Sequence, residues 1–343
     1  MKSPRSSGSP LPTHRRRVLR HLAGVAGLAA GGAAALAGLP AHAQAYPSRA
    51  IRLVVPWPPG GLVDVAARQL ATRLQAALGQ PVVVENRVGA GGSIGADLVA
   101  KAPADGHTLL FSTSALTINA AMQTRLPFEL NRDFEPVCLL AQAPSVLVVG
   151  PSLNPASVRE LVELARSRPG QLSYGSAGVG SPAHLAGELF KSLQRLFIVH
   201  IPYTGAPAAM NDQLAGRLDF QFANIAVALP QVRAGKVRAL AVTGAQRFAG
   251  LPQVPTMVEA GVANFEADQW LGLLAPRGLP AATQARLAAE CQKALAQEEL
   301  RAALLQSGMT AAPAGTPASF EAAIKAELAK WSAVVKAANI QPE

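Results

Sequence analysis

Four turns of this sequence carry glycines and small polar residues of the kind that bind ligands through the main chain. Each turn follows an apolar run rich in Val, Leu or Ile and precedes a helical pattern. Glycine lets the backbone approach a ligand closely, and the free N–H groups of a helix's first turn favour an anion. We therefore expect a small anion to be held largely by main-chain donors. The residues expected at this site are Trp57, Pro59, Gly60, Gly61, Asp64, Ser112, Thr113, Ser114, Ser176, Ala177, Gly178, Gly180, Ser181, His184, Tyr203, Thr204, Gly205 and Asn224.

Each of these residues also has a purely structural interpretation. A single turn of this kind is more often a plain helix cap, as with Ser181 before Pro182, and only the four together favour a binding site. Trp57 suits a ligand's carbon skeleton or the core. Asp64 suits the dipole of the predicted helix, the Gly60-Gly61 loop or a ligand's amino group. Ordinary packing or turn contacts would account equally for three further residues, His184, Tyr203 and Asn224.

Two short patterns suggest enzymes. Residues 91–95 match the G-x-S-x-G nucleophile elbow of α/β-hydrolases, although several residues separate Ser93 from the predicted strand ending at Glu85. A secreted serine hydrolase that uses Ser93 therefore stands as the alternative. Residues 178–183 are similar to a dinucleotide fingerprint, but no acidic residue ends the following strand. The histidines show no metal-ligand spacing with Cys, Asp or Glu, so we expect no catalytic residue, cofactor or metal.

The first 45 residues have the pattern of an export signal. An arginine cluster precedes an apolar run at 22–39 that is rich in Ala, Gly and Leu, and small-x-small cleavage sites follow at 41–43 and 43–45. The cluster, which approximates the twin-arginine pattern, is Arg15, Arg16, Arg17 and Arg20. The run is too short and too rich in glycine for a membrane anchor. We expect cleavage after Ala43 or Ala45 and a periplasmic protein, with the Sec and twin-arginine routes both open.

Charge gives no sign of a nucleic-acid partner. The formal net charge is +10, but six basic residues and no acidic residue lie in the export signal, so the mature chain keeps +4. A mild excess of this size attracts anions without forming the concentrated basic face that nucleic-acid binding requires.

Cysteine usage does not specify a disulfide. Cys138 and Cys291 are the only two cysteines, and they lie far apart in the sequence. They could pair in an oxidising compartment, but buried thiols are common, so we expect two free thiols.

After the export signal, short apolar runs alternate with helix-period segments, which is typical of α/β proteins. Strands are predicted at 51–55, 82–85, 108–112, 146–149, 172–175, 197–201, 218–222 and 237–243. About 300 mature residues fit two lobes better than one. We expect lobe 1 to comprise 46–146 and 270–343, and lobe 2 to comprise 147–269. The crossings between them are expected at 146–149 and 270–274.

An ordered series of motifs resembles the tripartite tricarboxylate transporter substrate-binding family, the Bug-type receptors. The series is PWPPGG at 56–61 with Asp64, VENR at 84–87, GAGG at 89–92, YGSAG at 174–178, HLAGE at 184–188, PY at 202–203, AGKVRALAVT at 234–243, VPT at 254–256 and EAG at 259–261. The resemblance covers nearly all of the mature sequence.

The resemblance implies a periplasmic binding protein fold of type II-like form. Each of its two lobes would hold a mixed sheet flanked by helices, and two crossings would act as a hinge. It also implies a small carboxylate ligand and delivery to the membrane permease components of a tripartite transporter. We expect a monomer.

We expect the carboxylate to lie between the Gly60-Gly61 turn and the 176–181 turn, where closure of the lobes would bury it. Which carboxylate it is stays open. The partner is either a permease or, as another alternative, a membrane sensor.

Overall fold

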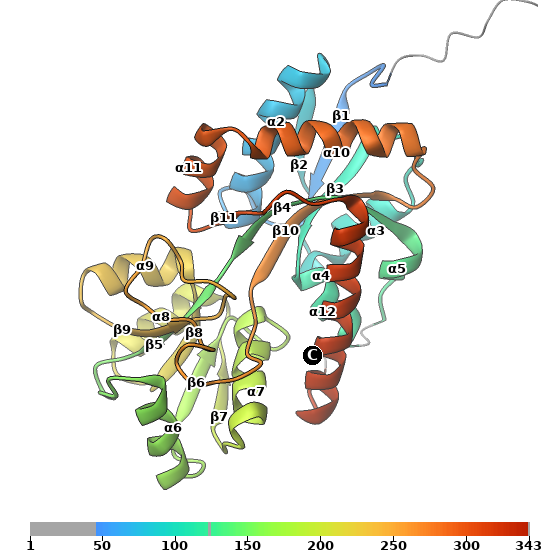
Figure 1. Ribbon diagram of the computed structural model, residues 1–343. Coiled ribbons are helices and arrows are strands. Elements are labelled where there is room, and N and C mark those ends of the chain that lie inside the picture. The colour runs from blue at the N-terminus through green and yellow to red at the C-terminus, as the bar shows by residue number, and fades with distance from the viewer. Residues whose placement is uncertain (1–45, 123–124, 342–343) are drawn as a thin grey trace, which may run out of the picture. The chain divides into compact units, whose positions relative to one another are not determined.

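The computed structural model describes residues 46–122 and 125–341 of the 343-residue chain. The predicted export signal at 1–45, with its arginine cluster and cleavage sites, lies outside the described residues. The chain from Tyr46 onward forms one compact unit with two β-sheets (Figure 1).

The first sheet is mixed and has the strand order β11-β4-β10-β3-β1-β2. Its strands are β1 Ile51–Val55, β2 Val82–Asn86, β3 Thr108–Thr113, β4 Phe134–Ala143, β10 Gln269–Pro276 and β11 Thr310–Ala311. β1 is parallel to β2 and β3, whereas β10 is antiparallel to β3 and β4. β11 adds antiparallel to the outer edge of β4.

The second sheet is also mixed and has the order β7-β6-β8-β5-β9. Its strands are β5 Ser145–Val149, β6 Ser173–Ser176, β7 Val199–Pro202, β8 Phe220–Asn224 and β9 Arg238–Val242. β6 is parallel to both β7 and β8, while β5 runs antiparallel to β8 and β9. The α/β class and the mixed sheets are therefore confirmed.

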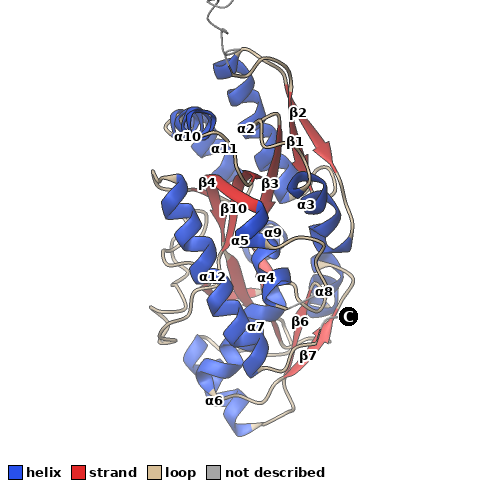
Figure 2. Ribbon diagram, turned by 90° about the vertical axis from the view of Figure 1, so that its right-hand side faces the viewer, coloured by secondary structure: helices blue, strands red, loops and turns tan. Residues whose placement is uncertain are grey.

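Helices flank both sheets (Figure 2). In the first half of the chain they are α2 Leu62–Leu78, the 3₁₀ turn η1 Ala90–Gly92, α3 Ser93–Ala100, α4 Ala115–Ala121, α5 Leu130–Asp133 and α6 Val158–Ser167. The others are α7 Pro182–Gln194, α8 Ala206–Leu214, α9 Ile225–Arg233, α10 Ala281–Leu295, α11 Glu298–Gln306 and α12 Pro317–Ala337. Among these described helices, none has the length and apolar character needed to cross a membrane.

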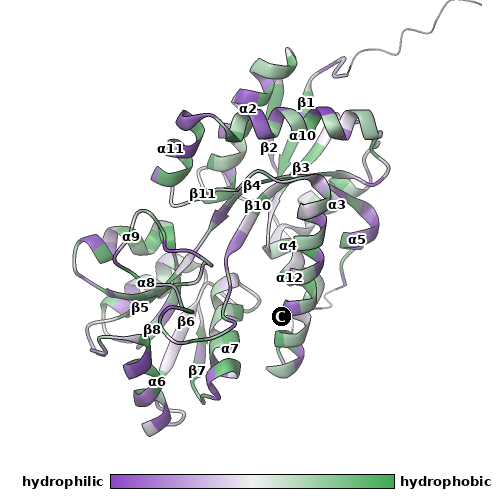
Figure 3. Cartoon of the chain, viewed as in Figure 1, coloured by the Kyte–Doolittle hydropathy of each residue, from purple (hydrophilic) through white to green (hydrophobic). Residues whose placement is uncertain are grey.

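Local sequence signals set several helix ends. Gly79 ends α2 in the left-handed conformation, with φ 69°, and its N–H bonds back to the Gln75 carbonyl. Thr316 and Ser319 form a reciprocal capping box at the start of α12. The surface helices α6 and α11 each contain both hydrophilic and hydrophobic residues (Figure 3), as expected of helices that pack one face on a core.

The central strands β1, β3, β5 and β10 are buried on both faces, which is why they consist largely of apolar residues. In β1, Leu53 and Val55 belong to one core and Val54 to another. A third core lies under the second sheet, and it includes Ile118 of α4 and Trp331 of α12. Helices that follow first-sheet strands therefore pack against the core of the second sheet.

Two crossings join the sheets. Pro144 alone separates β4 from β5, and residues 243–268 lead from β9 to β10. The segments in which the sequence predicted the crossings, 146–149 and 270–274, lie inside β5 and β10 themselves. The lobe limits of 46–146 with 270–343, and 147–269, stay a proposal.

Hydrogen bonds tie the two crossings together. The amide of Ser145 donates to Thr243 Oγ1 over 2.8 Å, and the amide of Thr243 donates to the Ser145 carbonyl over 3.0 Å. The Thr243 hydroxyl also contacts Asp268 Oδ1 at 3.0 Å. Burial raises the pKa of Asp268 to about 6, against the hydrogen bond from Thr243.

Candidate functional site

The predicted turns lie at the carboxyl edges of the two sheets. Parallel strands end at one edge, so β1, β2 and β3 bring their carboxyl ends together, as do β6, β7 and β8. The crossings leave from these same edges, because β4 ends there and the antiparallel β10 begins there. The topology therefore places the turns of both sheets beside the hinge, where ligands bind in open α/β sheets.

In the first-sheet turn, the Asp64 carboxylate fixes the loop. Its Oδ2 accepts from the amide of Gly60 and from Arg68 Nε, each over 2.9 Å, and its Oδ1 accepts from Asn86 Nδ2 over 2.9 Å. Asp64 is only 2 % exposed. Burial opposes its ionisation, but the hydrogen bonds from Arg68, Gly60 and Asn86 outweigh burial and lower its pKa. Of the three interpretations of Asp64, this geometry favours the one that fixes the loop.

Asn86 is a structural residue of this turn that the sequence prediction missed. It ends β2, and its Nδ2 donates to the Trp57 carbonyl over 2.9 Å as well as to Asp64. Arg68 donates in turn to Asn86 Oδ1 over 3.2 Å. A polar residue at the end of a predicted strand was the available signal.

The half-buried Trp57 ring supports the neighbouring glycine-rich turn. A Cβ at Gly92 would lie 3.2 Å from the ring, and Gly92 has φ 95°, so only glycine fits there without strain. Asn119 Nδ2 donates to the Gly91 carbonyl over 2.9 Å and anchors the other side of the turn.

The end of β3 is fully buried. Within the described part of the chain, the hydroxyls of Ser112 and Ser114 have no hydrogen-bond partner, and these residues are 0 % and 1 % exposed. Thr113 Oγ1 lies 3.5 Å from the amide of Ala115. A pair of unsatisfied buried hydroxyls is costly, which marks this strand end as a place where a partner would be favourable.

In the second-sheet turn, the Ser176 hydroxyl organises the loop. It donates to the Gly178 carbonyl over 3.0 Å, accepts from the amide of Gly178 over 3.1 Å, and lies 2.7 Å from His200 Nε2. Gly178 and Gly180 have φ of 121° and 73°. Among the described residues, the amides of Ala177 and Val179 find no acceptor.

Ser181 and His184 fix the end of this turn. Ser181 caps α7 by accepting from the amide of His184 over 3.3 Å, and His184 Nδ1 accepts from the amide of Gly180 over 3.1 Å. Burial, with Lys191 adding to it, lowers the pKa of His184 to about 4. The His184 ring is thus neutral at pH 7.

The remaining predicted residues have different structural roles. The Tyr203 hydroxyl donates to Asp212 Oδ2 over 2.9 Å, and the Tyr203 amide donates to the Ser176 carbonyl over 3.1 Å. Asn224 caps α9 through the amide of Ala226. Thr204 precedes Gly205, the N-cap of α8, where no side chain caps the helix.

A pocket of about 490 Å³ lies between η1, α3 and α4, which follow first-sheet strands, and the turn before α7 of the second sheet. Its lining comprises Ala90, Gly91, Ser93, Ile94, Asp97, Asn119, Met122, Arg125, Leu126, Pro127, Val179 and Gly180. Gly180 is the member shared with the predicted site, and a Cβ there would lie 2.5 Å from Met122 Sδ. Turns of the two sheets therefore approach each other at this point.

The pocket lining does not assemble a serine-hydrolase site. Ser93 is the first residue of α3, and β2 ends at Asn86, so Ser93 is not on a strand-to-helix elbow. No histidine is among the lining residues, and the Asp97 carboxylate is paired with Lys101. A nucleophilic serine needs an adjacent base.

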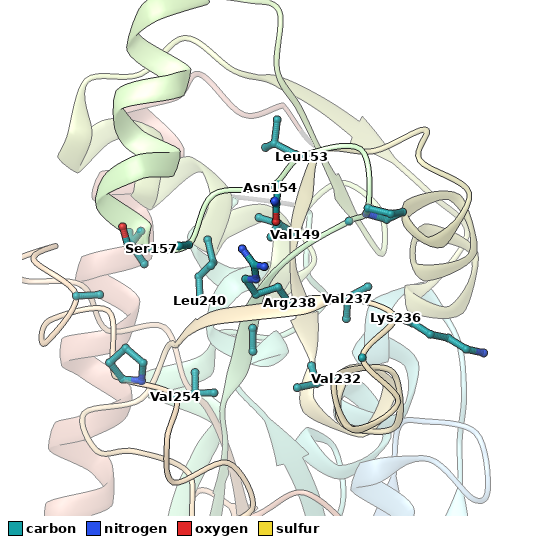
Figure 4. A pocket seen from close by; sticks show the side chains of 18 of the residues that line it. Val149, Leu153, Asn154, Ser157, Val232, Lys236, Val237, Arg238, Leu240 and Val254 are labelled. Atoms are coloured by element: carbon teal, nitrogen blue, oxygen red, sulfur yellow. The ribbon is translucent and has the colours of Figure 1, made fainter.

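A pocket of about 650 Å³ lies at the opposite edge of the second sheet (Figure 4). Val149 at the end of β5, Arg238 at the start of β9 and Ser157 before α6 line it. Arg238 donates to the Pro155 carbonyl over 3.0 Å. None of the predicted site residues lines this pocket.

No group of three or more His, Cys, Asp or Glu residues in the described ranges could hold a metal. Cys138 and Cys291 are buried free thiols. A hydrogen bond with Cys138, followed by burial, raises the pKa of the Cys291 thiol, which keeps it protonated and unreactive.

Two lobes built on mixed sheets, with glycine-bearing turns at the edges joined by the hinge, define a solute-binding protein of the periplasmic type. The chain belongs to the tripartite tricarboxylate transporter receptor family, since the model described as "Tripartite tricarboxylate transporter family receptor" matches residues 66–340. The resemblance found in the motifs is thereby confirmed.

Curated relatives support the family. A UPF0065 protein from the tcbD-tcbE intergenic region of Pseudomonas sp. (strain P51) is 42 % identical over 293 residues, which cover 85 % of this chain and 87 % of the relative. Protein BugT of Bordetella pertussis is 38 % identical over 299 residues, covering 87 % of this chain and 91 % of BugT.

Solved structures agree with the fold. A Rhodopseudomonas palustris protein solved with adipate has a TM-score of 0.75 and 36 % identity, over 87 % of this chain and 100 % of that protein. MatC from the same organism, with bound malate, has a TM-score of 0.71 and 32 % identity, over 84 % and 100 %. The family is one of extracytoplasmic solute receptors and not a class of enzymes.

Proposed function

We propose that this protein is an exported receptor that captures a small carboxylate between its two lobes and delivers it to the membrane permease of a tripartite transporter. Relatives with adipate and malate support the ligand class. The residues predicted at the strand-end turns form the site, some by contacting the ligand and others, such as Asp64, by holding the turns.

The observation that carries this proposal is a set of main-chain donors left open at the two carboxyl edges. Gly61 and Gly205 are the N-cap residues of α2 and α8, and neither helix has a side-chain cap. The amides of Ala177 and Val179 likewise have no acceptor within the described residues. Helix N-termini and free amides stabilise an anion through charge-assisted hydrogen bonds.

Uncharged donors suit a receptor that must release its ligand. A buried arginine would have to lose its hydration each time the lobes close, which costs several kcal/mol, whereas amides carry no net charge to desolvate. The nearby Asp64 does not repel an anion strongly, because Arg68 and two further donors already neutralise and occupy its carboxylate.

Calorimetric titration tests the ligand class. We expect adipate, malate or another aliphatic mono- or dicarboxylate to bind more tightly than its neutral amide or methyl ester, because only the carboxylate complements the open amides. Tightest binding to a neutral or cationic solute would overturn the proposal. Ser93→Ala serves as the matched control, with binding retained and no ester hydrolysis in either protein.

Cell fractionation and light scattering test the remaining parts. The mature protein should be found in the periplasm, shortened after Ala43 or Ala45, and should have the mass of a monomer with and without carboxylate. A cytoplasmic full-length chain or a stable dimer would contradict these parts of the proposal.

A further inference from the structure

Two histidines from different elements stack on each other, and each contacts the 176–181 turn through a hydrogen bond. His184 of α7 and His200 of β7 have ring centroids 3.9 Å apart and an interplanar angle of 11°. Each ring reaches one end of the turn, because His184 Nδ1 accepts from the amide of Gly180 and His200 Nε2 contacts Ser176 Oγ. The motif-based prediction included His184 and missed His200.

The protons of this network can be assigned from its contacts. The Ser176 hydroxyl has one proton, and it donates to the Gly178 carbonyl while its oxygen accepts from the Gly178 amide. All the contacts are satisfied together only when His200 Nε2 carries a proton and donates to Ser176 Oγ. His184 Nδ1 must be unprotonated, because it accepts from the Gly180 amide.

Charged groups lie on one side of the stacked histidines. Glu188 Oε1 lies 4.0 Å from His184 Nε2 and accepts from Lys191 and from the Tyr174 hydroxyl, each over 2.7 Å. Glu188 and Lys191 lie on α7, and Tyr174 lies on β6 with its ring stacked on His200 at 4.9 Å. The Glu188 charge is thus shared between a cation and a phenol, which leaves the imidazoles without a full ionic partner.

We propose that His184 and His200 are positioning residues for the ligand, because together they hold the Gly180 amide and the Ser176 hydroxyl and so present the amides of Ala177 and Val179 to an anion. This inference rests on the proposed function and adds the device that shapes one side of its site. Neither histidine has to touch the ligand.

Acid should disable this device. A proton on His184 Nδ1 would set a donor against the donor of Gly180 and place a charge on a ring stacked against His200. Burial first, then Lys191 for His184 and His184 itself for His200, lowers the pKa of both rings to about 4. The turn is therefore held at neutral pH and released as the pH falls towards 4.

Matched substitutions separate hydrogen bonding from packing. His200→Phe and His184→Phe keep a stacked ring without the turn contacts, and each should weaken adipate or malate binding at pH 7 about tenfold. His200→Gln supplies an N–H near Nε2, and His184→Asn supplies an acceptor near Nδ1, so each should stay within about threefold of wild type. Phe variants that bind as well as wild type would overturn the proposal.

Measurements without ligand keep the inference apart from the proposed function. Nitrogen-detected NMR of the wild type should show both rings as neutral Nε2–H tautomers that titrate near pH 4. Amide hydrogen exchange of residues 176–184 should be faster in the Phe variants than in the Gln and Asn variants. If no carboxylate binds the wild type, the proposed function fails while these two readouts still decide the positioning role. A titration near 6.5, or an Nδ1–H tautomer at His184, would disprove it.

Discussion

The turn after β1 and the turn after β6 occupy equivalent edges of their sheets, yet a charged group holds the first and neutral groups hold the second. Asp64, an ionised carboxylate, fixes the first turn through the amide of Gly60 and pairs with Arg68. Neutral imidazoles and a hydroxyl fix the second, through His184, His200 and Ser176.

The difference shows that one strand-end turn can be held with charge and the other without it. The carboxylate of the first turn is paired with the Arg68 cation, so the electrostatic field of the carboxylate is largely cancelled. The imidazoles and the hydroxyl of the second turn add no net charge, but the turn depends on two depressed pKa values. The two turns should therefore respond differently to substitution and to pH.

The largest effect is expected from Asp64→Ala. It leaves the Gly60 amide, Asn86 and the Arg68 guanidinium without their shared acceptor, and should lower the free energy of unfolding by about 3 kcal/mol. Arg68→Ala is the control. Because the Arg68 side chain is 53 % exposed, this substitution should lower the free energy of unfolding by less than about 1 kcal/mol. Urea denaturation measures both, and equal losses would show that the carboxylate is not the centre of the turn.

Gly180→Ala and Gly60→Ala compare the two turns directly. Both glycines have positive φ, 73° and 78°, but an added Cβ at Gly180 meets Met122 Sδ at 2.5 Å and one at Gly60 meets nothing within 4 Å. We expect a loss of about 2 kcal/mol at Gly180 and about 1 kcal/mol at Gly60. In a Met122→Ala background the Gly180 loss should fall to about 1 kcal/mol, and an unchanged loss would exclude the steric cause.

The pH dependence of stability should separate the turns. The folded pKa of His184 and His200 is about 4 against an ordinary 6.5, so the unfolded chain binds more protons between these values. Each histidine should thus lower stability by up to about 2.5 kcal/mol as the pH falls from 6.5 to 4, with the smaller share from His200, which solvent screens more because it is less buried. The contribution of Asp64, whose pKa is lowered from 3.8, is complete above that value and is lost only below it.

The contribution of the two histidines to the pH profile of stability is obtained by comparing the wild type with a double variant. A His184→Asn, His200→Gln double variant should show a flatter curve between pH 6.5 and 4 and an unchanged curve below it. A parallel shift over the whole range would mean that these rings do not titrate as described.

The smallest effect is expected from Asp268→Asn at the crossings. Its folded pKa of about 6 exceeds the ordinary 3.8, so ionisation of Asp268 costs stability as the pH rises from about 4 to 6. The amide keeps an acceptor for Thr243, and we expect a gain below about 1 kcal/mol at pH 7, measured by thermal unfolding. Because this change has the opposite sign to that of the histidines, the variant should also steepen the acid loss; a decrease in stability at pH 7 would contradict the prediction.

The sequence by itself determined most of the elements and their order. The apolar run Ile51–Val55 predicts a buried strand, and Gly79 predicts a helix end because glycine adopts the left-handed conformation easily. Both signals lie in neighbouring residues, so these elements were predictable from the sequence. It also located the turns and Ser181 as a cap, because capping is a contact between residues three apart. β4 was missed, and its ten residues include Pro136, which masks the strand pattern.

Only the tertiary structure decided how the turns are held. The contacts of Asn86 with Asp64, of His200 with Ser176 and of Gly180 with Met122 join residues that are 22, 24 and 58 positions apart. Such contacts depend on which strands become neighbours in a sheet and which helices pack across the lobes. A short-period sequence pattern does not specify which strands and helices become neighbours. In the folded chain, burial and the need to pair every buried polar group determine these neighbours.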